Sequence, residues 1–314
     1  SSHRRQRQMC IRDRTVITLL MLGMVVSTIS CSKGSGKKQE EVKPASELFY
    51  PNPKPYTRWW WFADEIHKKD IKHQLDWMKE NNFGGVEVAW LYPLYRFEKH
   101  IDTPKYVTPW LSDEWSDVVF YTKKYADSIG LGCDFTFGTS WPFGDSHVPN
   151  EDRTRVWGDT AWRHMLRFSW EFPVKGNVLN HLDKDAFYRY AKRHGNALQE
   201  ALKGSRSALF CDSWETKLND KLKPWTPGFD TAFQNRFGYD LTQYMPQLDS
   251  FPDVRYDYMQ LLSDYVIEEF YKPLTKVSHD LGAFSRVQCL ASPTDLMEAC
   301  AHVDVPESEA MLNE

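Results

Sequence analysis

Short apolar runs alternate with stretches of helical periodicity along most of the chain. Residues 86–90 (VEVAW) and 207–211 (SALFC) are typical of β-strands, whereas residues 253–280 carry apolar side chains at helical spacing. Six strand-like runs occur, at residues 56–62, 86–90, 131–137, 207–211, 284–289 and 304–307. Strands that alternate with helices predict a parallel sheet with helical crossovers, which is an α/β fold.

Polar residues and glycines mark the ends of the intervening helices. Asp64 and Ser112 are suitable N-caps, and Gly130 is suited to end the helix that Ser112 begins. Pro273 is expected to kink the long helix in which it lies. We expect helices at residues 64–81, 112–129, 183–203, 253–280 and 294–302.

The choice between an open sheet and a closed barrel rests on motifs. No GxGxxG follows the first strand and no GxxxxGK[ST] occurs, which disfavours an open sheet of the nucleotide-binding type. Several strands end in polar or aromatic clusters, as in (β/α)8 barrels, whose catalytic residues follow the carboxyl ends of the strands. Because about six βα units are present and a barrel needs eight, we predict an incomplete TIM-type barrel.

The N-terminal part is predicted to be a targeting segment. Residues 15–30 form an apolar run preceded by Arg12 and Arg14, too short for a comfortable membrane span and typical of a secretory signal. The run ends at Ser30-Cys31, which resembles a bacterial lipobox with Cys31 as the lipid-modified residue. We therefore expect a secreted lipoprotein, in the periplasm or at the outer membrane and cell surface. It would be attached to the membrane through its lipid alone. Ordinary secretion is the alternative.

These observations divide the chain into three parts. Residues 1–31 are interpreted as an artefactual start, up to residue 14, followed by the lipoprotein signal. Residues 32–55 are rich in Ser, Gly, Lys, Glu and Pro and predict a flexible linker. Residues 56–314 are predicted to form the partial barrel.

Composition narrows the function. The net charge of −4 and the pI near 6.2 lack the basic excess of nucleic-acid-binding proteins. Aromatic residues make up 15% of the chain, and while most must be core, some could offer flat apolar platforms to a sugar. The cysteines show no CxxC or short Cys/His spacing, which disfavours a structural zinc site. Cys133, Cys211 and Cys289 lie in apolar runs and are expected to be buried free thiols.

The strongest candidate for chemistry is residues 209–215 (LFCDSWE), where an apolar strand ends in two carboxylates beside a large ring. An apolar wall raises the pKa of a carboxyl group and keeps it protonated near neutral pH, as an acid catalyst requires. Glu215 and Asp212, with Trp214 between them, are therefore candidates. The alternative is that Asp212 caps the next segment and Glu215 is solvated.

Further candidates are weaker singly. Glu307 and Glu309 alternate in a strand-like run and would share one face, unless they belong to a surface turn. Trp141 lies in a Gly- and Pro-rich segment (GTSWPFGD) that is either a binding loop or a structural turn. Glu87 is either an inward barrel carboxylate or an edge charge. Neither HExxH nor GxSxG occurs, and metal ligands cannot be assigned.

Taken together, several motifs resemble glycoside hydrolase family 106, which contains α-L-rhamnosidases. They are RWWW at 58–61, GGVE at 84–87, GTSWPFG at 138–144, LFCDSWE at 209–215, FGYD at 237–240, SRVQ at 285–288 and DVPESE at 304–309. The resemblance extends from residue 56 to the end of the chain and is weakest at residues 146–175, where this chain is shorter.

The resemblance implies an inverting hydrolase on a (β/α)8 barrel, usually with added β-sandwich domains. Glu215 matches the family's Asp-Ser-Trp-Glu position and is implied as the acid of a carboxylate pair, whose second member is expected beyond residue 314. Glu307 or Glu309 would then bind sugar or a cation, and calcium is suggested for some relatives. The other expected binding residues are Trp60, Trp61, Glu87, Trp141, Asp212 and Trp214.

The predicted function is hydrolysis of α-L-rhamnosidic or related linkages in plant-type oligo- or polysaccharide, with this part of the chain inactive alone. Two alternatives remain. One is a non-catalytic carbohydrate-binding surface lipoprotein, which would need no strand-end glutamate in an apolar setting. The other is a barrel glycosidase with a different sugar specificity.

Overall fold

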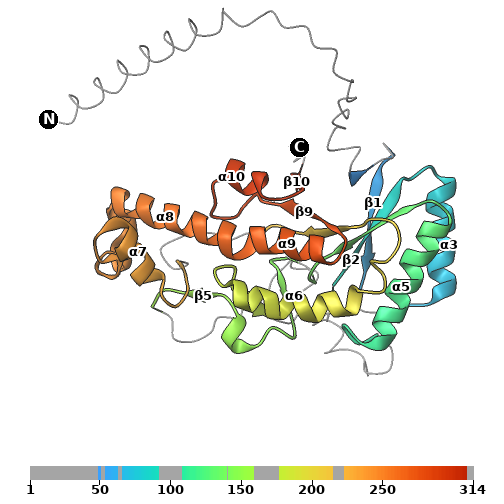
Figure 1. The fold of residues 1–314 in the computed structure, drawn as a ribbon, viewed down its shortest axis with the longest axis horizontal. Helices are drawn as coiled ribbons and strands as arrows, with labels where there is room; N and C mark the ends of the chain where they lie inside the picture. The colour runs from blue at the N-terminus through green and yellow to red at the C-terminus, as the bar shows by residue number, and fades with distance from the viewer. Residues whose placement is uncertain are drawn as a thin grey trace, which may run out of the picture. The chain divides into compact units, whose positions relative to one another are not determined.

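Six strands form one parallel sheet in the computed structural model, which describes residues 49–50, 54–62, 66–91, 108–139, 141–158, 177–214 and 223–309 (Figure 1). The strand order is β1-β2-β3-β7-β9-β10, which follows the order of the chain. The strands are β1 (Tyr56–Trp61), β2 (Gly85–Trp90), β3 (Gly132–Thr136), β7 (Ala208–Cys211), β9 (Phe284–Gln288) and β10 (Val305–Glu307). All neighbours pair in parallel, so the predicted α/β class and all six predicted strands are confirmed.

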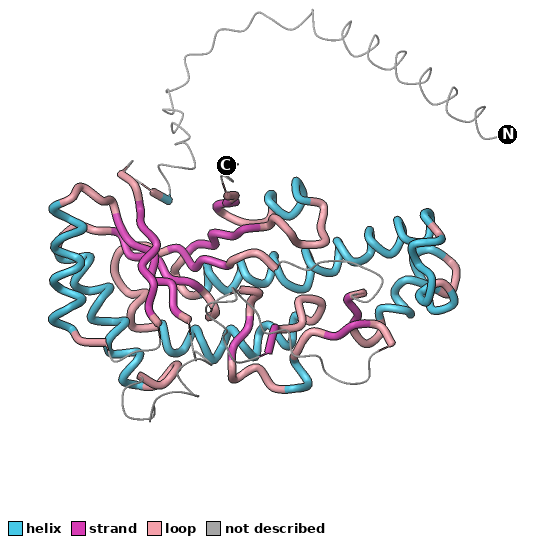
Figure 2. The backbone as a smooth tube through the Cα atoms, turned by 180° about the vertical axis from the view of Figure 1, so that it is seen from behind, coloured by secondary structure: helices cyan, strands magenta, loops and turns pink. Residues whose placement is uncertain are grey.

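Helices connect the strands and pack on one another in sequence (Figures 1 and 2). Helix α3 contacts α5, α5 contacts α6, and α6 contacts α9. The helices are α3 (Lys68–Glu80), α5 (Asp113–Ser128), α6 (Lys184–Leu198), α7 (Phe229–Phe237), α8 (Pro252–Val266), α9 (Lys272–Asp280) and α10 (Leu296–Ala301). Short 3-10 helices are η3 (Asn150–Asp152), η4 (Leu241–Gln243) and η5 (Met245–Ser250). Two small antiparallel pairs join β4 (Gly144–Asp145) to β6 (Asn177–Val178) and β5 (Arg155–Val156) to β8 (Pro224–Trp225).

Local capping chemistry explains where several helices begin. Ser112 Oγ accepts a hydrogen bond from the Trp115 amide at 3.1 Å, as predicted. The Asp183 side chain accepts from two amides of the first turn of α6. Helix α3 begins at Lys68 with His67 as its N-cap, later than predicted, and Asp64 lies outside the described residues.

The predicted helix at residues 253–280 is divided into two α-helices by a short turn of a different helical type. Helices α8 and α9 are joined by a π-helical turn, η6 (Ile267–Tyr271). Pro273 lies in the first turn of α9, directly after this turn. Proline has no amide hydrogen and crowds the preceding turn, and a wider π turn accommodates both effects.

The two faces of the sheet differ sharply in chemistry. Because strand side chains alternate, one face carries the apolar residues and packs against the helices, with Trp90 contacting Trp115 of α5. The apolar set includes Val86, Val88, Trp90, Cys133, Phe135, Leu209, Cys211 and Val287, all buried. The opposite face carries charged residues from different strands, since Arg58 pairs in register with Glu87, and Glu87 with Asp134. The sheet therefore collects charge on one side.

The thiols and the N-terminal segments complete the description. Cys133, Cys211 and Cys289 are buried and free, as predicted, and Cys300 is free and half-buried.

Phe49 and Tyr50 fall within the predicted linker but pack on the sheet, with the Phe49 ring 4.9 Å from that of Phe284. Cys31 and the predicted signal lie outside the described residues. Within the described ranges, no helix is both long and apolar enough to cross a membrane.

Candidate active site

Arg286 of β9 is the centre of a buried charged network on the polar face of the sheet. Its guanidinium contacts Glu87 of β2, Asp134 of β3 at 2.9 Å (Nη1 to Oδ2) and Glu307 of β10 at 2.7 Å (Nε to Oε2). Only 9% of the Arg286 side chain is exposed. A buried charge is costly unless it is paired, and here three strands supply the partners.

Arg58 of β1 extends the network toward the end of β7. Its Nε lies 3.2 Å from Glu87 Oε1, and its Nη1 lies 3.4 Å from Asp212 Oδ2. Asp212 is the first residue after β7. The guanidiniums of Arg58 and Arg286 lie 4.6 Å and 4.8 Å from the ring centroid of Phe210, within the range of a cation–π contact.

Neutral groups also donate hydrogen bonds to the carboxylates of Asp134 and Glu87. Tyr50 Oη donates to Asp134 Oδ2 at 2.9 Å, and the Ala208 amide donates to Asp134 Oδ1 at 2.7 Å. Thr136 Oγ1 donates to Glu87 Oε1 at 3.1 Å. Glu87 and Asp134 are therefore fully engaged within the protein, which suits residues that hold the site together.

Carboxylates outnumber cations in this network. Among the described residues, Glu87, Asp134, Asp212 and Glu307 form ion pairs with Arg58 and Arg286, so these four carboxylates exceed the two cations by two charges when all are ionised. Burial raises the pKa of Asp212 to about 6, Arg58 acts against that rise, and the charges of Glu87 and Glu309 add to it. Burial also raises the pKa of Asp134 to about 6. A carboxyl group that titrates near neutral pH at a strand end is typical of catalytic sites.

Asp212 should make folding stability depend on pH. Its pKa is about 6 in the folded protein, against an ordinary value of 3.8, so its stabilising contribution is complete below pH 4 and is lost as pH rises to about 6. We expect Asp212→Asn to reduce the slope of unfolding free energy between pH 4 and pH 6, measured by urea unfolding. Asp134 titrates in the same range, so part of the slope should remain. An unchanged slope, equal to that of the surface variant Asp117→Asn, would contradict this assignment.

The structure brings several of the predicted site residues together. Glu87, Asp212 and Glu307 belong to the network, and Glu309 is close enough to Asp212 for its charge to raise that pKa. Glu87 is buried and paired with Arg58 and Arg286, so it is not an exposed edge charge. Glu215 lies outside the described residues.

The tryptophans divide between the two faces. Trp60 lies on the polar face and is 38% exposed, with Arg58 above its ring at 5.4 Å and Trp141 at 6.2 Å. Trp61 points the other way and is buried, packed against Trp90. Trp60 and Trp141 therefore line the network side, whereas Trp61 belongs to the core.

Trp214 is also buried, and it anchors the segment that carries Asp212. Its ring stacks on that of His181 at 4.3 Å with an interplanar angle of 8°. His181 also packs on Phe270, and burial lowers the pKa of His181 to about 3, so the imidazole is neutral. This stack holds the residue that directly precedes Glu215.

Sequence reasoning did not single out Tyr50, Arg58, Asp134 or Arg286 as site residues. Three of them carried a usable signal, because Arg58, Asp134 and Arg286 are charged residues within otherwise apolar strands. Such a residue must be paired inside the fold or lie at a functional site. Tyr50 carried no such signal, since it lies in a segment of linker-like composition.

Among the described residues, no group of His, Cys, Asp and Glu has an arrangement that could hold a metal ion. The clustered carboxylates are already occupied by Arg58 and Arg286.

Comparison with known proteins confirms the family resemblance. Residues 174–313 match the model of glycoside hydrolase family 106, described as alpha-L-rhamnosidase. A rhamnosidase structure from Novosphingobium sp. PP1Y is similar with a TM-score of 0.58 and 12% identity, over 83% of this chain and 49% of that chain. A beta-galactosidase from the Antarctic haloarchaeon Halorubrum lacusprofundi is similar with a TM-score of 0.51 and 10% identity, over 79% of this chain and 39% of that chain.

These structural similarities concern the fold alone, because the identities are low. The chain spans about half the length of the rhamnosidase structure that it matches. A search of curated proteins returned no match.

Proposed function

Starting from the α-L-rhamnosidase family match over residues 174–313, we propose that this chain is part of an enzyme that hydrolyses α-L-rhamnosidic or related linkages in plant-type polysaccharide. The observation that carries the proposal is the carboxylate-rich network on one face of the parallel sheet, with Asp212 and Glu307 at the carboxyl ends of their strands. Enzymes built on parallel α/β barrels place their catalytic groups at that end.

We propose that the sheet is part of a (β/α)8 barrel. Its strand order follows the chain without reversal, and its helices pack on one another in the same sequence. An open doubly wound sheet reverses its strand order at a switch point and places helices on both faces. Sequential order with one charged face is the arrangement that a barrel interior would have.

The proposed mechanism is inverting and uses Glu215 as the general acid. Glu215 directly follows Trp214, whose ring is held by His181, and is three residues from Asp212. The acid protonates the leaving oxygen while a second carboxylate, roughly 6.5–9.5 Å away, activates a water on the opposite face of the sugar. Asp212, Glu307 and Glu309 would accept hydrogen bonds from sugar hydroxyls, with Trp60 and Trp141 as aromatic walls. Arg58 holds Asp212 in place.

We also propose that the protein is secreted and anchored through a lipid on Cys31, at the periplasmic or outer surface. The support for this is the apolar run at residues 15–30 followed directly by cysteine.

The direct test is release of nitrophenol from aryl glycosides by the full-length protein. We expect the α-L-rhamnoside to be cleaved in preference to the β-galactoside and other aryl glycosides. Cleavage of another glycoside instead would indicate a barrel glycosidase of different specificity. Binding of the polysaccharide without release from any glycoside would contradict the enzyme proposal and favour a carbohydrate-binding lipoprotein.

A further inference from the structure

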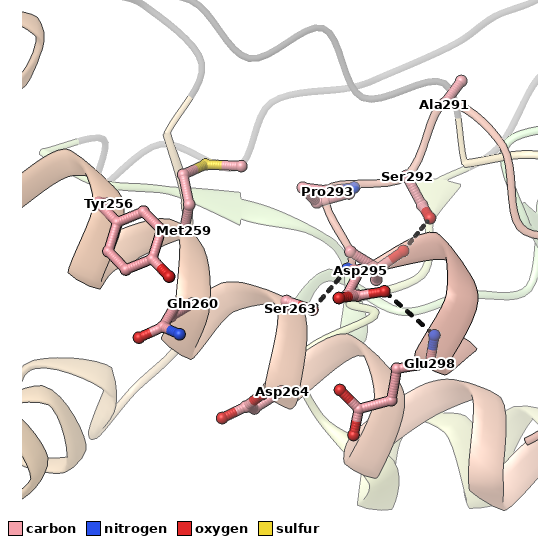
Figure 3. Close-up of a pocket in the computed structure, with 11 residues that line it drawn as sticks. Tyr256, Met259, Gln260, Ser263, Asp264, Ala291, Ser292, Pro293, Asp295 and Glu298 are labelled. Carbon is pink, nitrogen blue, oxygen red and sulfur yellow. Dashed lines mark hydrogen bonds between the residues drawn. The ribbon is translucent and has the colours of Figure 1, made fainter. Parts of the chain in front are cut away.

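A cavity of about 510 Å³ lies between α8 and the segment that joins β9 to α10 (Figure 3). One wall is formed by Tyr256, Met259 and Gln260 of α8, and the other by residues 291–295 and Glu298. The Asp295 amide donates to Ser263 Oγ at 2.8 Å and ties the two walls together. The volume is within the range of about 300–1,000 Å³ that is usual for sites that bind small molecules.

This cavity is separate from the charged network, because none of the network residues lines it. The cavity nevertheless lies next to the same end of β9 as the charged network. The segment of residues 289–295 leaves β9 at its carboxyl end, where Gln288 contacts Glu307 at 3.3 Å. The cavity and the candidate active site therefore use the same end of β9.

The lining combines an apolar platform with polar groups that have no partner in the described part of the protein. Tyr256 is 64% exposed, and Met259 and Pro293 add apolar surface. Gln260 and Glu298 both line the cavity, and the side chain of neither makes a hydrogen bond with a described residue (Figure 3). A flat ring beside unused amide and carboxylate groups suits a sugar, which has apolar CH faces and hydroxyl edges.

The negative charge of the cavity lining favours neutral sugars over uronates. Of the described residues that line it, Asp264, Asp295 and Glu298 are carboxylates and none is Lys, Arg or His. Asp264 is paired with Arg236, and Asp295 accepts from the amides of Met297 and Glu298, so Glu298 is the carboxylate available to a ligand. An unpaired carboxylate repels a uronate and accepts hydrogen bonds from the hydroxyls of a neutral sugar.

We propose that this cavity binds neutral sugar units of a polysaccharide, at a subsite separate from the residues that cleave it. The identity of the ligand as part of a substrate rests on the proposed glycosidase function. The cavity would increase the affinity of the protein for a long polysaccharide, and it would bind neutral segments more tightly than segments that contain uronate.

The test measures binding rather than hydrolysis, in full-length protein with Glu215→Gln in the background. The probes are a neutral rhamnose-containing trisaccharide and an oligogalacturonide of equal length, titrated by calorimetry. We expect Tyr256→Ala to weaken neutral binding by roughly tenfold, equivalent to about 1.4 kcal/mol. Tyr188→Ala removes an exposed tyrosine of α6 outside the cavity and should change nothing. Glu298→Lys should raise the affinity for the oligogalacturonide.

Hydrogen exchange locates the site independently of affinity. The neutral trisaccharide should protect residues 256–264 and 291–298 in the parent and not in Tyr256→Ala. Equal affinities for Tyr256→Ala and Tyr188→Ala, no protection there, or preference for the oligogalacturonide would each overturn the proposal. A protein that cleaves no glycoside but meets these expectations would retain the site and lose only the proposed enzymatic function.

Discussion

Glu215→Gln in the full-length protein should lower the rate on a natural rhamnoside by about 10²–10⁴-fold, the usual contribution of general acid catalysis. The amide keeps the size of the side chain but cannot donate a proton to the leaving oxygen. An activated aryl glycoside needs little protonation, so its cleavage should decrease much less. Steady-state rates on both substrates measure the difference.

The pattern of losses decides the role of Glu215. Equal losses on both substrates would make it the base, because water attack is impaired in each case. No loss on either substrate would contradict a catalytic role. Glu200→Gln, an exposed glutamate paired with Lys203, is the matched control and should leave both rates unchanged.

Arg286→Met should destabilise the protein by about 3–5 kcal/mol, the usual result of removing one partner from a buried ion pair. Methionine fills similar volume but leaves Glu87, Asp134 and Glu307 without their shared cation. Urea unfolding of the full-length protein, followed by tryptophan fluorescence, measures the loss. The matched control is Arg255→Met, which breaks a half-exposed pair with Asp249 and should cost under about 1 kcal/mol.

A second variant keeps this prediction testable if Arg286→Met does not fold. Arg286→Met combined with Glu87→Gln removes one of the unpaired charges and should recover part of the lost stability. A loss for Arg286→Met no larger than that of Arg255→Met would mean that the network does not stabilise the fold.

Much of the fold was predictable because its signals are local. Strand and helix periodicities are visible in short windows, and Ser112 caps its helix through a contact with an amide only three residues away. The thiols Cys133, Cys211 and Cys289 were predictable for the same reason, since each lies in an apolar run.

The composition of the site was only partly predictable. Glu87, Asp212 and Glu307 could be named individually, but Arg286, the shared partner of Glu87 and Glu307, is separated from Glu87 by 199 residues. Strand alternation shows that Trp60 and Trp61 face opposite ways, but it does not show which of them faces the charged network. Sheet register and the packing of helices on one face decide that, through contacts distant in the chain.

The sequence by itself therefore determined the α/β class, the six strands and the family resemblance, because periodicity, capping and motifs are properties of neighbouring residues. Only the tertiary structure decided that Glu87 is buried, that Tyr50 donates a hydrogen bond to Asp134, and that a cavity lies between α8 and the β9–α10 segment. Each of these depends on how strands pair and how helices pack across long separations, where burial and the pairing of charge select one arrangement.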